Sequence, residues 1–359
     1  MSRARDIADL SSVSARLDTV GGSSGALSNR NLIINGAMQV WQRATAATAV
    51  TNSTYGTVDR FRFWENTDGA YTAERSTDVP SGQGFAYSTK LVVTTADTSL
   101  AAGQYAQLAQ RIEAQNLQRL SYGTSGAKNV TVSFWVKSSK TGNYAFNLLK
   151  NAAGNTSYLY YKSFSIDAAN TWEKKIITVS PTAGSTSFIT SSAGAIDPAT
   201  TSGMEVYFTL AMGSTYHGAT DDSWSSNTNQ YSTSSNVNWM DSTSNNFYIT
   251  GVQLEVGDTA TDFEHRSFGD ELAKCQRYYA QGGVILSDTT PDRYHNTINL
   301  PCEMRAQPTV SSGGIDSGSG GTMVSTWDSS NSSTSKRNFY QGANNSVVSN
   351  SWFAFDAEL

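Results

Sequence analysis

The residues best suited to chemistry lie in one long polar segment, Gly213 to Asn246. Four aromatic residues punctuate its Asn, Ser and Asp residues: Tyr216, Trp224, Tyr231 and Trp239. Flat aromatic rings stack on the faces of sugar rings, while amides and hydroxyls satisfy the sugar hydroxyls. Polar segments longer than about 12 to 15 residues are usually functional or disordered. The segment therefore predicts a glycan-binding loop; the alternative is that these rings anchor the loop or pack between subunits.

Signatures of catalysis are weak. The three histidines, His217, His265 and His295, lack the spacing of metal ligands, and we expect His265 to hold structure by hydrogen bonding. Neither a G-x-S-x-G elbow nor a phosphate loop is present. Asp221 and Asp222 are compatible with the acid pair of a glycanase, a solvated loop or a calcium ligand pair. We expect no catalytic residue, no metal ligand and no cofactor, with a structural calcium ion as the open exception.

The composition is that of a folded, polar protein. Hydrophobic residues make up 38% and charged residues 15% of the chain, which has 8 Trp, 17 Tyr and 14 Phe. Disordered chains combine low hydrophobicity with high net charge and few aromatics. The net charge of −5 argues against nucleic acid as a partner. No apolar run approaches the roughly 20 residues of a membrane helix, and the N-terminus lacks the apolar core of a signal peptide. We therefore expect no membrane insertion.

The elements that position the polar segment are predicted to be strands. From Leu32 onward the apolar residues recur with a period of two, as in the run Val58–Trp64. Roughly nine such runs, separated by Gly, Asn, Ser and Thr clusters, predict a two-sheet β-sandwich over residues 29–266. The segment Gln104–Leu120 fits either a helix or a strand pair.

A short amphipathic helix is predicted before the sandwich, with a frayed tail as the alternative. Its apolar seam consists of Ile7, Leu10, Val13, Leu17 and Val20. A helix of about four turns is not stable alone, so the seam requires copies of itself or a docking surface on a larger assembly. A Gly/Ser-rich hinge follows, and residues 1–28 form this attachment segment.

Two further units are predicted after the sandwich. Asp270 and Glu271 precede Lys274 and Arg277, a charge order that suits the dipole of a linking helix over residues 267–280. Short apolar runs among Gly and Ser then predict a small β domain over residues 281–359. A polar domain of this size buries little surface, and association with further copies would stabilise it.

Several segments together resemble a module of bacteriophage tail-fibre and other virion appendage proteins. Two of them lie about 200 residues apart: NLIINGAMQVWQR at Asn31–Arg43, and GVQLEVGDTATDFEHRSFGDELAKCQRYY at Gly251–Tyr279. The resemblance continues through VDRFRFW at Val58–Trp64, WVKSSKTGNYAF at Trp135–Phe146 and PCEMRAQPTV at Pro301–Val310. It therefore spans most of the chain, and it concerns architecture and role without supplying a catalytic residue.

The order of the strands also resembles the jelly-roll of carbohydrate-binding modules. The matching residues are Phe134, Trp135, Gly142, Trp172 and the run FYITGVQLE at 247–255. Any β-sandwich core has residues of these kinds, and a jelly-roll fold does not by itself imply sugar binding.

The resemblance implies a mainly β protein that works in a virion. It would be a homotrimeric tail fibre or fibre-like adhesin, synthesised in the host cytoplasm and attached through its N-terminus to other tail or adaptor proteins. It would bind a glycan of the host surface through multivalent contacts. One alternative is a tailspike-like glycan depolymerase, and another is a decoration or neck protein without host binding.

Overall fold

The computed structural model describes residues 29–50, 54–151, 156–286, 295–314, 323–325, 336–341 and 348–359. They belong to two compact units that divide between His265 and Arg266, and each unit is treated by itself. The predicted N-terminal helix with its seam of Ile7 to Val20 lies outside the described residues.

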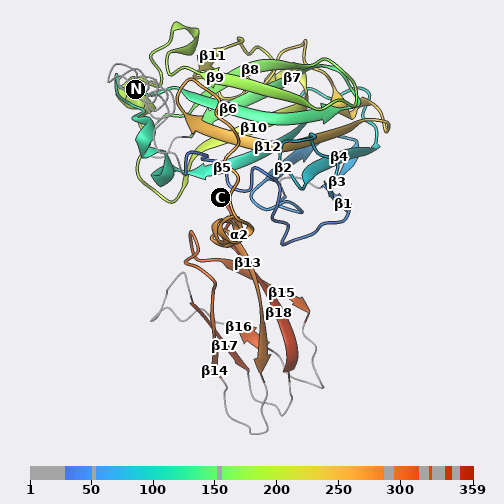
Figure 1. The fold of residues 1–359 in the computed structure, drawn as a ribbon, viewed down its shortest axis with the longest axis vertical. Coiled ribbons are helices and arrows are strands. Elements are labelled where there is room, and N and C mark those ends of the chain that lie inside the picture. The colour runs from blue at the N-terminus through green and yellow to red at the C-terminus, as the bar shows by residue number, and fades with distance from the viewer. Residues whose placement is uncertain are drawn as a thin grey trace, which may run out of the picture. The chain divides into compact units, whose positions relative to one another are not determined.

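The first unit is a sandwich of two antiparallel six-stranded sheets (Figure 1). One sheet, sheet A, contains in spatial order β1 (Thr48–Ala49), β3 (Ala70–Ser76), β4 (Ser88–Thr95), β12 (Asn246–Val256), β6 (Val130–Ser138) and β9 (Glu173–Val179). The other, sheet B, contains β11 (Ser223–Ser225), β8 (Tyr158–Ile166), β7 (Gly142–Lys150), β10 (Ser202–Met212), β5 (Tyr105–Glu113) and β2 (Arg62–Asn66). Successive strands pass repeatedly from one sheet to the other, so the chain wraps around its core as in a jelly-roll. The expected mainly β sandwich is confirmed.

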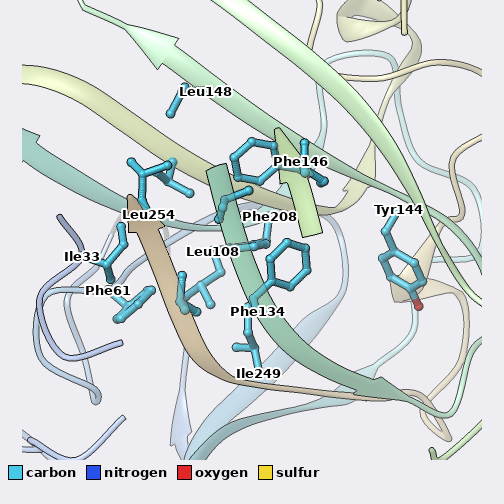
Figure 2. Packing of buried hydrophobic residues seen from close by; sticks show 14 of the residues in the cluster. Ile33, Phe61, Leu108, Phe134, Tyr144, Phe146, Leu148, Phe208, Ile249 and Leu254 are labelled. Carbon is cyan, nitrogen blue, oxygen red and sulfur yellow. The ribbon is translucent and has the colours of Figure 1, made fainter. Parts of the chain in front are cut away.

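Aromatic side chains fill the space between the two sheets. Phe134 of β6 lies edge to face against Phe208 of β10 and Phe164 of β8, with ring centroids 4.9 and 5.2 Å apart. Figure 2 shows Phe134, Phe146, Phe208 and Ile249 converging in this core. Alternation along a strand sends every second residue inward. Burial of each such side chain contributes roughly 1.5–3 kcal/mol, which explains why strands with this pattern form a sandwich.

The two segments about 200 residues apart that carry the family resemblance meet in the sandwich. Leu32 N–H donates to the Leu254 carbonyl at 2.8 Å, and Val252 N–H donates to the Gly36 carbonyl at 2.9 Å. The Asn31 side chain also bridges the segments, because its Oδ1 accepts from Leu254 N–H at 3.1 Å. These hydrogen bonds therefore join the first residues of the sandwich to β12.

The segment Gln104–Leu120 contains both kinds of structure. Strand β5 ends at Glu113, and a 3-10 helix, η1 (Ala114–Leu120), follows it directly. Leu108 in the strand and Leu117 in the helix are both buried in the same core. The spacing of the apolar residues changes from two to three within the segment. The sequence pattern was therefore compatible with both a helix and a strand pair.

One lysine lies inside the sandwich. Lys150, at the end of β7, is 0% exposed, and its Nζ donates to the Thr156 and Ala193 carbonyls at 2.9 and 3.4 Å. Burial lowers the pKa of Lys150 to about 8, against a smaller opposing effect of Asp197. The unfolded chain keeps this proton up to about pH 10.4. The unfolded state therefore binds more protons between these pH values, and stability rises with pH there.

We expect Lys150→Met to remove this pH dependence. Between pH 8 and 10.5, the free energy of unfolding of the wild type should rise relative to that of Lys150→Met by about 3 kcal/mol. Urea unfolding of both proteins, followed by tryptophan fluorescence at several pH values, measures this difference. If the free energies of unfolding of the two proteins change in parallel between pH 8 and 10.5, the burial of Lys150 does not lower its pKa.

The second unit begins with the helix α2 (Phe268–Gln276). Its N-cap is Ser267, whose side-chain oxygen accepts from Asp270 N–H at 3.2 Å, and Lys274 lies in its last turn. These features fit the predicted linking helix. The helix ends earlier than predicted because Tyr279 begins a strand.

Among the described residues, six strands in two sheets follow the helix. They are β13 (Tyr279–Leu286), β18 (Val348–Asp356) and β15 (Thr309–Gly314) in one sheet, and β14 (His295–Asn299), β17 (Lys336–Gln341) and β16 (Met323–Ser325) in the other. The expected small C-terminal β domain is therefore confirmed. Arg305 holds the C-terminal end of the chain in this unit, because its guanidinium donates to the Ala357 and Glu358 carbonyls at 2.8 and 3.0 Å. In the part of the chain that the structure describes, no helix has the length and apolarity to cross a lipid bilayer.

A candidate aromatic groove on sheet B

The outer face of sheet B carries a cavity of about 210 Å³, which we call the aromatic groove. It is lined by Trp64, Tyr105, Gln107, Tyr207, Met212, Tyr216, Asn229 and Tyr231. None of these side chains is charged. The volume lies below the 300–1,000 Å³ of most small-molecule pockets, so the groove suits one ring-sized group of a larger ligand.

Three neighbouring strands supply the floor of the groove. Trp64 of β2 pairs with Gln107 of β5, which pairs in turn with Thr209 of β10. Directly paired residues share one face of a sheet, so these side chains form a row across the strands. Tyr207 lies two residues from Thr209 on β10 and therefore points the same way.

The loop after β10 supplies the opposite wall. Tyr216 lies in a short 3-10 helix, η4 (Ser214–Tyr216), and Tyr231 lies further along the loop. The Asn147 side chain on β7 holds this loop by donating to the Tyr231 carbonyl at 3.0 Å. The groove is therefore formed by strands of sheet B on one side and by an anchored loop on the other.

The aromatic rings of the groove contact one another edge to face. The centroid of Tyr105 lies 6.5 Å from that of Trp64 and 5.8 Å from that of Tyr216. Tyr231 continues the series, 6.4 Å from Tyr216 and 5.4 Å from Tyr207. The interplanar angles lie between 65° and 80°. The rings therefore form a curved wall that can present faces and edges to one ligand.

A relay of hydrogen bonds fixes the polar part of the floor. Gln107 Nε2 donates to Thr209 Oγ1 at 2.7 Å, and Thr209 Oγ1 donates to Asn147 Oδ1 at 2.9 Å. Gln107 and Thr209 are both buried. Since the relay uses the amide nitrogen of Gln107, its carbonyl oxygen is oriented away from Thr209 and can accept from a ligand hydroxyl.

Charged side chains lie beside the groove and not in it. Glu205 forms an ion pair with Arg111, Nε to Oε1 2.6 Å, and accepts a hydrogen bond from the Tyr207 hydroxyl. Arg62 lies over the ring of Trp64, 3.9 Å from Cζ to the centroid. Burial, and then Glu205, raise the pKa of Tyr231 to about 12. The Tyr231 hydroxyl is therefore neutral at physiological pH and can both donate and accept.

The structure divides the predicted glycan-binding residues into two pairs. Tyr216 and Tyr231 line the groove. Trp224 is 2% exposed, and its indole N–H donates to the Ser180 carbonyl at 2.8 Å. Trp239 is 0% exposed and packs against Tyr71 at a centroid distance of 5.5 Å. Rings buried to this extent have no face for a sugar, so these two tryptophans anchor the loop, as the alternative interpretation held.

The strand residues of the groove were missed by the sequence interpretation. Trp64, Tyr105, Gln107 and Tyr207 lie outside the polar segment on which that interpretation rested. A usable signal existed, because Trp64 and Tyr207 occupy outward positions of alternating strands. Large aromatic residues at outward positions of several strands mark a surface patch.

The acidic pair in the loop is bound by protein donors. Asp221 accepts from Ser163 N–H at 2.8 Å and pairs with Lys162 at 2.6 Å, while Asp222 accepts from the Tyr160 hydroxyl at 2.7 Å. These contacts give both carboxylates a structural role. Within the described ranges, no group of three or more His, Cys, Asp or Glu residues is placed to hold a metal ion. His265 makes one hydrogen bond, in which its Nε2 donates to the Gln83 carbonyl at 3.1 Å.

Comparison with known proteins gives similarity to solved structures only. No protein-family model and no curated protein sequence matches the chain. An enzymatically active domain of tailspike protein 4 from bacteriophage CBA120 is 12% identical, with a TM-score of 0.31 over 63% of this chain and 21% of that one. A putative sugar-binding protein from Bacteroides thetaiotaomicron is 13% identical, with a TM-score of 0.35 over 63% of this chain and 99% of that one. A family 11 carbohydrate-binding module from Clostridium thermocellum is 10% identical, with a TM-score of 0.27 over 62% of this chain and 99% of that one. The chain thus spans about a fifth of the tailspike domain and nearly all of the other two.

Proposed function

We propose that the sandwich binds a neutral glycan in the aromatic groove. The observation that carries this proposal is the combination of five aromatic rings with an entirely uncharged lining. Sugar rings offer apolar C–H faces and many hydroxyls, and the groove offers aromatic surface, tyrosine hydroxyls and the Gln107 amide. A volume of about 210 Å³ suits one sugar residue of a longer chain.

The groove is built for binding and lacks the arrangement for hydrolysis. Glycoside hydrolases place two carboxyl groups on either side of the scissile bond. No acidic residue lines the groove. Glu205 beside it is held by Arg111 and by the Tyr207 hydroxyl. A tailspike-like depolymerase is therefore the weaker of the two candidates for this site.

We further propose that the protein is a bacteriophage virion component, a tail fibre or fibre-like adhesin that binds a host surface glycan. The motif pair at Asn31–Arg43 and Gly251–Tyr279 supports this role through its resemblance to virion appendage proteins. The N-terminal seam from Ile7 to Val20 would form a homotrimer or attach to tail or adaptor proteins. Three sites on one body would bind a repetitive surface with high avidity. A decoration or neck protein without host binding is the remaining alternative.

Replacement of Trp64 tests the binding proposal. We expect the wild type to bind one or more oligosaccharides on an array of bacterial surface glycans. Trp64→Ala should lower the affinity by roughly tenfold or more, because the largest aromatic ring of the groove is lost. Trp172→Ala is the matched control, since Trp172 lies on the outer face of the other sheet. Circular dichroism checks that all three proteins are folded.

The same samples separate the alternatives. A mass by light scattering near three times the 38.6 kDa of one chain is expected for the trimeric adhesin. Release of reducing ends from a bound polysaccharide would favour the depolymerase instead. A protein that binds no glycan on the array and no host cell would be a structural component only.

A further inference from the structure

A second pocket lies on the outer face of sheet A, on the opposite side of the sandwich from the aromatic groove. Its volume is about 170 Å³, and Ser133 and Trp135 of β6 form its floor. Lys174 of β9 and Asp262, which follows β12, stand at its rim. Every residue that lines it belongs to the first unit. We call it the Trp135 pocket.

Four polar side chains of this pocket have no partner among the residues that the structure describes. Ser133 is 4% exposed, yet its hydroxyl makes no hydrogen bond to any other residue that the structure describes. Within the same described residues, the Trp135 indole N–H, the Lys174 ammonium and the Asp262 carboxylate also make no hydrogen bond or ion pair. The Ser133 hydroxyl is open to the cavity, so a molecule bound there can supply the hydrogen-bond partner that the protein does not.

Other lysines on the same face of sheet A are paired. Lys90 contacts Glu74 at 2.6 Å, and Lys137 forms an ion pair with Asp78. Lys174 therefore differs from its neighbours on this face.

Aromatic packing forms one wall of the pocket before any ligand binds. The rings of Phe85, Phe263 and His265 contact one another with centroids 4.9 to 5.2 Å apart. Gly251 allows this packing, because a Cβ there would lie 2.6 Å from Phe85 Cζ and its φ is +64°. A preformed wall lowers the entropy that a ligand must lose on binding.

Strand order places opposite charges at opposite ends of the pocket. In sheet A, β6 lies between β12 and β9. Lys174 pairs directly with Trp135 on the β9 side. On the other side Gln253 of β12 donates to the Asp262 carbonyl at 3.3 Å, which holds that segment beside β12. A ligand over Trp135 thus meets an ammonium at one end and a carboxylate at the other.

We infer that the Trp135 pocket binds an acidic sugar residue, a hexuronate. In such a pyranose the C5 carboxylate and the C2 hydroxyl lie across the ring from each other. The carboxylate pairs with Lys174, the hydroxyls donate to Asp262, and the apolar face of the ring stacks on Trp135. Ser133 supplies a further hydroxyl partner. The sandwich would then carry two sites with different sugar preferences, and this second site does not depend on the aromatic groove.

Titration of the full chain with D-glucuronate tests this inference. The probe signal is the indole N–H resonance of Trp135 in a ¹H–¹⁵N spectrum, assigned with Trp135→Phe. We expect a saturable shift with a roughly millimolar Kd, as suits a ligand of this size, and weaker binding at high salt. Lys174→Gln should weaken binding by roughly tenfold, whereas Lys128→Gln, at an exposed lysine away from the pocket, and Trp64→Ala should leave it unchanged.

Three results would overturn the inference. Equal binding of methyl β-D-glucoside would show that the carboxylate is not recognised. Equal binding of L-alanine would show a site for a small zwitterion in place of a sugar. No shift of the Trp135 resonance with glucuronate, in a protein with the wild-type circular dichroism spectrum, would show that the pocket is not a glucuronate site. None of these results bears on the groove, whose test uses Trp64.

Discussion

Gly36→Ala is expected to lower the free energy of unfolding of the sandwich by about 3 kcal/mol or more. A Cβ at this position would lie 2.0 Å from the Val252 carbonyl oxygen. The Gly36 carbonyl also accepts from Val252 N–H at 2.9 Å, so the two backbones cannot separate without breaking this bond. Since the obstacle is backbone and not a flexible side chain, one segment must move as a whole. The melting temperature should fall by roughly 6–12 °C.

Gly103→Ala is the matched control for this substitution. Nothing lies within 4 Å of a Cβ at Gly103. Both variants lose the same backbone freedom in the unfolded state, so the difference between them isolates the steric contact. Urea unfolding followed by tryptophan fluorescence reports mainly on the sandwich, because six of the eight tryptophans precede Arg266. Equal midpoints for the two variants would disprove the close approach of the two motif segments.

The sequence was sufficient to predict the class of fold. Period-two runs such as Val58–Trp64 and the acidic-to-basic order of the residues from Asp270 to Lys274 are local patterns, and they predicted a sandwich followed by a short helix. The pairing of strands is not local. Strand β12 lies between β4 and β6, and the contact of Gly36 with Val252 joins residues more than 200 positions apart. Such contacts depend on how loops close in space, which periodicity does not encode.

Of the four aromatic residues that the sequence singled out, two line the candidate groove. The polar segment gave Tyr216 and Tyr231, because long loops rich in aromatic and amide residues are often binding loops. It also gave Trp224 and Trp239, which a sequence pattern cannot tell from exposed rings until the sandwich beneath them is known. Trp64 and Tyr207 reach the groove only because β2, β5 and β10 are neighbours. The sequence pattern shows that both side chains point outward, but their approach to each other depends on strand order, which spacing along the chain does not give.

Asn35→Ala is expected to lower the free energy of unfolding by about 4 kcal/mol or more. Asn35 is 0% exposed, with a φ of +59°. Its Nδ2 donates to the Val40 and Asp59 carbonyls at 2.9 and 3.0 Å, and its Oδ1 accepts from the N–H groups of Gln39 and Val40 at 2.8 and 2.9 Å. Alanine removes all four hydrogen bonds and leaves their backbone partners buried. Each loss costs about 1 kcal/mol, and the left-handed conformation adds about 1 kcal/mol for a residue with a Cβ and no polar side chain.

Asn170→Ala separates these two costs. Asn170 has nearly the same φ, +55°, but its side chain is exposed and makes no hydrogen bond to the other described residues. It should therefore lose only the conformational contribution, about 1 kcal/mol or less. If the two variants unfold at the same urea concentration, the Asn35 side chain does not hold the turn. If Asn35→Ala alone unfolds early, the role of Asn35 in the NLIING segment is to build this turn of the sandwich, and not to contact a ligand.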